Sequence, residues 1–187
     1  MNRGKIIIIS GPSGVGKGTI CRRLKSEDGI SVSVSVTERE PRPGEMDGVH
    51  YYFVSRGKFQ DMIKNDELIE WAQYGENHYG TPRSEVLKLL SQGKNVILEI
   101  DVQGAMQIKE REDDVITIFV VPPDMETLKK RLLGRGTESS EQQELRLNRA
   151  IEEMQYEDKY DFSVVNDSLE QAVIDIKKII EGVGKND

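Results

Sequence analysis

Nine residues near the start of the chain, GPSGVGKGT from Gly11 to Thr19, have the residue types and spacing of a loop that binds nucleotide phosphates. Gly11, Gly14 and Gly16 allow backbone conformations that turn amide N–H groups inward, and Lys17 can reach the β and γ phosphates. The usual pattern has Ser or Thr where this chain has Gly18, so it lacks a hydroxyl that commonly ligates Mg²⁺. We therefore expect Mg²⁺ to be held by phosphate oxygens, water and an outer-shell carboxylate.

Two acids at the end of a predicted buried strand are candidates for that carboxylate. Glu99 and Asp101 in NVILEID have a spacing of two, so both side chains leave the strand on the same side. Either acid could instead cap a helix that follows Val102. Two carboxylates near a phosphate loop favour the metal and nucleotide interpretation, with Asp101 as the outer-shell candidate.

A second anion site is indicated by TEREPRPGE, in which Arg39 and Arg42 lie three residues apart and two tyrosines follow within ten residues. Arginine binds phosphate through two parallel hydrogen bonds, and Pro41 and Pro43 stiffen the loop that carries it. The alternative is a charged loop that is merely solvated.

The elements that must position these residues follow an α/β pattern. Apolar runs over 5–10, 95–100 and 115–121 are typical of strands buried on both faces, and residues 162–165 predict a further strand. Helical spacing over 17–27, 124–133 and 169–180 predicts helices between or after them. This alternation predicts a three-layer fold around a parallel core sheet.

The segment between the first two of these units lacks that rhythm and predicts an inserted lobe. Ser31–Val36 alternates strictly between Ser and Val, which predicts one strand with a polar face. Shorter elements follow over 51–54, 56–64 and 67–74, and Thr81-Pro82 predicts a helix start. The polar stretch 134–140 interrupts the helical pattern later in the chain and can act as a hinge.

Bulk composition limits the partners. The chain has 187 residues, a net charge of −7 and one cysteine. An acidic chain argues against broad binding of nucleic acid, and neither a signal peptide nor a membrane span is recognisable. We expect a cytoplasmic protein with small-molecule partners and neither a nucleic acid nor a membrane partner. The sequence does not indicate an oligomeric state.

Eight segments together resemble the guanylate kinase family in order and spacing, from Ile6 to about Ile180: GPSGVGKGT, SVS with REPRPGE, YYFVS, LIEWAQY, YGTP, LEIDVQGA, LKKRLLGRGTES and VVND. The family phosphorylates GMP with ATP and Mg²⁺. The resemblance implies a P-loop fold in one domain, 1–187, with a core (1–34, 91–133 and 150–187), a GMP-binding lobe (about 35–90) and a small lid (about 134–149).

The resemblance also implies residue roles. Guanine would be read by Ser35 and Glu70, since a carboxylate accepts from N1–H and N2–H₂ and a hydroxyl can donate to O6. The implied GMP-binding set is Ser35, Arg39, Arg42, Tyr51, Glu70, Tyr79, Thr81 and Glu99. The implied ATP-binding set is Gly11, Pro12, Ser13, Gly14, Val15, Gly16, Lys17, Gly18, Thr19 and Asn166. The implied catalytic set is Lys17, Arg39, Arg131, Arg135 and Arg146.

Two departures and two alternatives accompany this resemblance. Glu38 stands where the family usually has Thr, beside the predicted phosphate clamp, and His78 replaces a common aromatic residue. Another nucleoside monophosphate kinase is one alternative, but Ser35 with Glu70 suits guanine and not adenine. The other is a non-catalytic binding module, and such modules tend to lose phosphate-loop residues such as Lys17.

Overall fold

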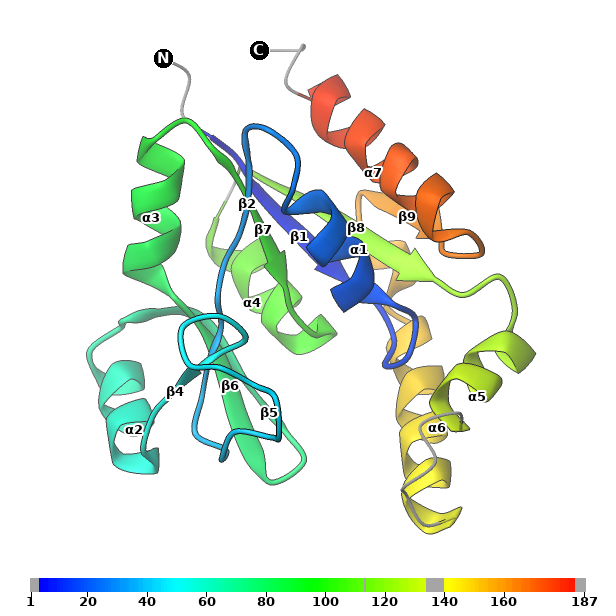
Figure 1. Cartoon of the computed structure of the whole chain (residues 1–187), viewed down its shortest axis with the longest axis horizontal. Helices are drawn as coiled ribbons and strands as arrows, with labels where there is room; N and C mark the ends of the chain where they lie inside the picture. Colours follow the sequence, from blue (N-terminus) through cyan, green and yellow to red (C-terminus); the bar gives the residue numbers. More distant parts are fainter. Residues whose placement is uncertain (1–3, 113, 134–139, 184–187) are drawn as a thin grey trace.

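A computed structural model describes residues 4–112, 114–133 and 140–183. Its centre is a five-stranded parallel sheet, in which β1 lies between β7 and β8 (Figure 1). The four isoleucines of β1 are buried, as the apolar run predicts. In spatial order the strands are β2 (Ile30–Val32), β7 (Asn95–Glu99), β1 (Ile6–Ser10), β8 (Val115–Val121) and β9 (Phe162–Val165).

Alternate residues of β1 enter two separate cores, one on each face of the sheet. Ile7 and Ile9 pack with α1 (Lys17–Leu24), α5 (Met125–Leu133), α6 (Ser140–Met154) and α7 (Leu169–Val183). Ile6 and Ile8 pack with α3 (Arg83–Ser91) and α4 (Val102–Arg111) on the opposite face. The predicted three-layer α/β fold with a parallel core sheet is confirmed.

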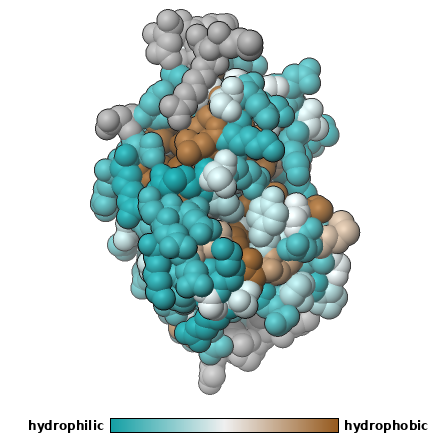
Figure 2. All heavy atoms as spheres, turned by 90° about the vertical axis from the view of Figure 1, so that its left-hand side faces the viewer, coloured by the Kyte–Doolittle hydropathy of each residue, from teal (hydrophilic) through white to brown (hydrophobic). Residues whose placement is uncertain are grey.

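A second, four-stranded sheet forms the inserted lobe at the lower left of Figure 1. Its order is β4 (Tyr52–Phe53), β3 (Val36–Thr37), β6 (Asn77–Pro82) and β5 (Leu68–Tyr74), and α2 (Arg56–Lys64) packs on it. A small core of its own holds the lobe together, formed by Val36, Phe59, Met62 and Leu68. Figure 2 shows the face that carries α2 and α3, which is largely hydrophilic with small apolar recesses.

The prediction of one strand over Ser31–Val36 is wrong. The chain pairs with β7 through β2, then leaves the core sheet and joins the lobe as β3. The Ser33 N–H still donates to the Ile97 carbonyl, while the Ser35 carbonyl already accepts from the Tyr52 N–H. Because the Ser-Val alternation continues through this change of sheet, the pattern alone does not show it.

The predicted start of α3 is also wrong. Thr81 belongs to β6 and gives its hydroxyl hydrogen to Glu70, so it does not cap the helix. Pro82 occupies the N-cap position and α3 begins at Arg83. Residues 134–139 of the predicted lid lie outside the described residues, and 140–149 form most of α6. Among the described helices none is long and apolar enough to cross a membrane.

Candidate active site

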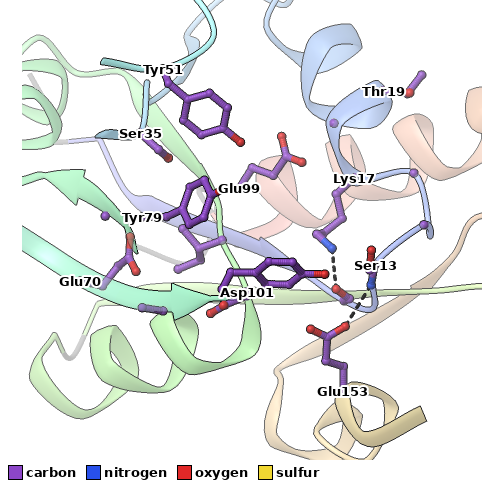
Figure 3. Close-up of a pocket in the computed structure, with 18 of the residues that line it drawn as sticks. Ser13, Lys17, Thr19, Ser35, Tyr51, Glu70, Tyr79, Glu99, Asp101 and Glu153 are labelled. Carbon is purple, nitrogen blue, oxygen red and sulfur yellow. Dashed lines mark hydrogen bonds between the residues drawn. The ribbon is translucent and has the colours of Figure 1, made fainter. Parts of the chain in front are cut away.

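A cleft of about 580 Å³ lies between the phosphate loop and the inserted lobe (Figure 3). The loop supplies one end, the lobe supplies the other, and β7 lies between them. The structure therefore brings together residues from the loop, the lobe, the end of β7 and α6. The predicted site residues that line the cleft are Gly11, Ser13, Gly14, Gly16, Lys17, Gly18, Thr19, Ser35, Arg39, Arg42, Tyr51, Glu70, Tyr79, Glu99, Asp101 and Arg146.

The phosphate loop wraps around the ammonium group of Lys17. Its Nζ donates to the carbonyl oxygens of Gly11, at 2.5 Å, and Pro12, at 3.1 Å. Gly16 precedes α1 with φ of 101°, a left-handed conformation that favours glycine. Burial lowers the pKa of Lys17, and the negative charges of Glu99 and Glu153 partly oppose that shift. A phosphate group here would supply the negative charge that the lysine favours.

Gly18 allows a carboxylate to approach the start of α1. A Cβ atom at this position would lie 3.3 Å from Oε1 of Glu99, a tight contact. Burial by the walls of the cleft raises the pKa of Glu99, although solvent reaches the side chain, and Lys17 and Arg22 lower it. Thr19 does not replace the missing hydroxyl, because its Oγ1 turns away and accepts from Arg22 at 3.0 Å (Figure 3).

Asp101 has the capping role that the sequence left open. Its Oδ1 accepts from the N–H of Gly104 at 3.0 Å and caps α4, while the residue also lines the cleft beside Glu99. Among the described residues, no group of three His, Cys, Asp or Glu side chains is placed to hold a metal ion. The oxygen chemistry of Glu99 and Asp101 fits Mg²⁺ that keeps most of its water, and it does not fit an all-protein cage.

Glu70 on β5 lies at the lobe end of the cleft and is only 4% exposed. Its Oε1 accepts from the Thr81 hydroxyl at 2.6 Å. Gly104 packs on its other side, where a Cβ atom would lie 2.3 Å from Oε2. Burial raises the pKa of Glu70 to about 7, the Thr81 hydrogen bond opposes the shift, and the charge of Asp101 adds to it. Thr81 thus orients Glu70 and does not itself line the cleft.

Arg39 is held from several sides near the middle of the cleft. Its two terminal nitrogens donate to the carboxylate of Glu45, each at 2.7 Å, and Nε donates to the Tyr79 hydroxyl at 3.2 Å. Its guanidinium also lies over the ring of Tyr51, 5.0 Å from the centroid. The arginine hydrogen bonds lower the pKa of Glu45 to about 2, and Glu45 also accepts from the N–H of Arg42.

Sequence reasoning missed Glu45 and Glu153. Glu45 follows the predicted clamp in the same Pro- and Gly-rich turn, and its spacing from Arg39 was the signal available. Glu153 on α6 is 5% exposed and accepts from the N–H of Ser13 at 3.0 Å. It also lies 3.5 Å from Nε of Arg149, whose guanidinium stacks on Tyr74 at 3.7 Å from the ring centroid. No local sequence signal marks Glu153, because its partner is distant.

Two residues expected to touch ATP lie behind the phosphate loop. Asn166 is buried and donates from Nδ2 to the Val15 carbonyl at 2.8 Å. Its own carbonyl accepts from Arg131 at 3.0 Å. Arg146 reaches the loop and contacts the Ser13 hydroxyl at 3.3 Å. Neither Asn166 nor Arg131 lines the cleft, so their nucleotide contacts stay predictions, and Arg135 lies outside the described residues.

Comparison with known proteins places these features in a family. Residues 3–183 match the family model described as guanylate kinase. A guanylate kinase of Clostridium perfringens (strain SM101) is 50% identical over 180 residues, covering 96% of this chain and 83% of the relative. One from Lactococcus lactis is also 50% identical, over 96% and 88%.

A solved structure agrees with the sequence relatives. The crystal structure of guanylate kinase from Anaplasma phagocytophilum matches with a TM-score of 0.81 at 34% identity, covering 97% of this chain and 86% of that one. The match extends through the core sheet and the inserted lobe, since it spans nearly all of this chain. By sequence and by structure, the chain belongs to the guanylate kinase family.

Proposed function

We propose that the cleft described above is where this chain carries out the ATP-dependent phosphorylation of GMP to GDP that its family membership assigns to it. One observation supports this assignment above the others. A phosphate loop and a buried carboxylate suited to guanine lie at opposite ends of one cleft, with an arginine and tyrosine cluster between them. Two nucleotides bound there would meet phosphate to phosphate.

Phosphoryl transfer needs positioning and charge stabilisation more than it needs a strong base. We assign Lys17 and the N–H groups of residues 11–19 to the ATP phosphates, and Arg39 with Arg42, Tyr51 and Tyr79 to the phosphate of GMP. A phosphate at Arg39 would compete with Glu45 for the same two nitrogens. Charge that develops on the transferring group would be met by Lys17, Arg39 and the lid arginines, Arg131, Arg135 and Arg146.

Guanine recognition is assigned to Ser35 and Glu70. The second oxygen of Glu70 and its position at the cleft wall suit acceptance from guanine N1–H and N2–H₂, while Thr81 holds the first oxygen. Adenine would present a bare N1 acceptor to the same carboxylate, and two acceptors repel. This chemistry discriminates against the alternative of an adenine-directed monophosphate kinase.

Bound Mg²⁺ would neutralise phosphate charge in this cleft. Asp101, as the outer-shell candidate, and Glu99 would hold it through water, since each carboxylate lines the cleft and Gly18 offers no hydroxyl. We further propose that the lobe over 35–90 and the lid over 134–149 close on the core when both nucleotides bind. A cytoplasmic location remains a proposal, consistent with the free, buried Cys21.

The test is a coupled assay with ATP, Mg²⁺ and each nucleoside monophosphate in turn. We expect kcat/KM for GMP to exceed that for AMP by at least about 10³-fold, since a site with buried polar groups rejects a mismatched ligand strongly. Glu70→Gln removes the carboxylate assigned to guanine, and Glu67→Gln in the same lobe is its matched control. Glu67→Gln alters an exposed ion pair with Lys58 and should leave the preference for GMP unchanged. Comparable use of AMP and GMP would contradict the assignment of Glu70.

A further inference from the structure

Two residues that depart from the family pattern, Glu38 and His78, contact each other behind the clamp. Nδ1 of His78 lies 2.5 Å from Oε1 of Glu38. Their side chains are 14% and 6% exposed, respectively. Each immediately precedes a clamp residue, Arg39 or Tyr79, and both clamp residues line the cleft whereas Glu38 and His78 do not. The pair therefore lies one residue from the proposed acceptor-phosphate site on both chain segments.

The contact between Glu38 and His78 links the end of β3 to β6 beyond the last backbone pairing of these two strands. Thr37 is opposite Tyr79 in the antiparallel pairing of β3 and β6, and β3 ends there. The Thr37 hydroxyl donates to the His78 carbonyl at 2.8 Å. Past this point the Glu38–His78 contact joins the chain that leads into Arg39 to the strand that carries Tyr79. Arg39 and Tyr79 themselves meet at 3.2 Å on the cleft side.

The pair is poorly suited to stabilising the fold. Among the described residues, Oε2 of Glu38 is buried and has no hydrogen-bond partner. A buried carboxylate with one partner costs free energy that a neutral residue would not. The His78 ring lies between Phe59 and Trp71, with ring centroids 5.8 Å and 6.0 Å away, so its orientation is fixed by packing. Fixed geometry at a cost in stability indicates a role in placing neighbouring groups.

We propose that Glu38 and His78 are positioning residues that together set the spacing of Arg39 and Tyr79 for the phosphate of the acceptor nucleotide. This inference rests on the proposed function of those two clamp residues. The carboxylate of Glu38 and the imidazole of His78 are then a matched pair, because a carboxylate in this place needs a donor opposite it. Replacing His78 alone should harm acceptor binding more than replacing both, because it leaves the carboxylate in place without a donor.

The test compares His78→Phe, Glu38→Thr and the double variant. His78→Phe has no hydrogen-bond donor and leaves the Glu38 carboxylate buried without its partner, so KM for GMP should rise about 10-fold while KM for ATP changes less than about 2-fold. Glu38→Thr should raise KM for GMP about 3-fold, and the double variant should resemble it, because no buried charge remains. A double variant as impaired as His78→Phe would overturn the proposal.

Further variants separate the possible causes of failure. Arg39→Lys tests the clamp itself: if it weakens GMP binding and His78→Phe does not, the positioning role is wrong and the clamp stands. An unchanged KM in Arg39→Lys would refute both. Glu67→Gln, which alters an exposed ion pair in the same lobe, should change neither KM. If His78→Phe fails to fold, Glu38→Gln replaces it, and an unchanged KM for GMP in that folded variant refutes the role.

Discussion

Replacing Glu70 by glutamine should stabilise the protein while damaging its use of GMP. The folded protein raises the pKa of this carboxyl from 4.5 to about 7, chiefly by burial. Because the folded state then binds a proton more tightly than the unfolded state, the free energy of unfolding falls as pH rises through this interval. At 1.36 kcal/mol per pH unit, the loss is about 3 kcal/mol above pH 7.

Glutamine is neutral at every pH and should recover much of that loss. Its carbonyl can still accept from Thr81, but its amide hydrogens need acceptors near Gly104, which offsets part of the gain. We therefore expect Glu70→Gln to be more stable than the wild type by about 1–3 kcal/mol at pH 8, and we expect this difference to be smaller by about 2.5 kcal/mol at pH 5. Urea unfolding at the two pH values measures the difference. An equal difference at both would refute the account of Glu70 as a buried, destabilised carboxylate.

The same variant should lose acceptor recognition. Each charge-assisted hydrogen bond from guanine contributes about 1.5–3 kcal/mol, so removing the carboxylate that accepts two of them should lower kcat/KM for GMP by at least about 10²-fold. KM for ATP should stay within about 2-fold, because the ATP site proposed above lies at the other end of the cleft. Ser35→Ala removes one neutral hydroxyl and should have a smaller effect. A stabilised Glu70→Gln enzyme with full GMP preference would place guanine recognition elsewhere in the lobe.

Two further predictions use the charges of the cleft. Lys17→Met should lower kcat by at least about 10²-fold, since a transition-state charge partner is lost, and it should not lower the urea midpoint, because the charged form of this lysine is disfavoured by burial. Steady-state rates and unfolding curves measure the two effects, and a retained kcat would remove Lys17 from the mechanism. In the wild type, kcat/KM for GMP should fall as pH drops below about 7, because the carboxylate of Glu70 becomes protonated and ceases to accept. Glu70→Gln is the control, since it lacks this titration, and an identical pH profile in both enzymes would contradict the prediction.

The three central strands of the core sheet, β7, β1 and β8, were predictable because each is a largely buried apolar run. The run of isoleucines in β1 and the apolar run in β8 are typical of strands that are covered on both faces of a parallel sheet. The passage from β2 to β3 was not predictable from the pattern, since the alternation of Ser and Val is the same in both sheets. Similarly, Thr81 has the residue type of a helix cap, but its hydroxyl donates to Glu70, which lies 11 positions earlier in the chain. The local sequence does not show this hydrogen bond.

Some site residues can likewise be recognised from their neighbours in the sequence, and others only from contacts with distant residues. The phosphate loop is contiguous, so its spacing, together with the predicted strand before it and helix after it, indicated its chemistry. Glu153 could not be found in this way, because its contact with Ser13 joins residues 140 positions apart. Glu38 and His78 were each visible as departures from a family pattern, but their pairing across 40 positions needed the structure. Long-range side-chain contacts are what sequence periodicity does not encode.

These observations have a common physical basis. Burial raises the pKa values of Glu70 and Glu99 and lowers that of Lys17, so each of these groups is destabilised in its charged form in the folded chain. Guanine donors would stabilise charge on Glu70, and phosphate would stabilise charge on Lys17. A nucleotide that lacks either feature leaves the corresponding charge unsatisfied. The free energy that these buried charges cost the fold is thereby converted into discrimination between nucleotides, because a matching ligand alone removes the cost.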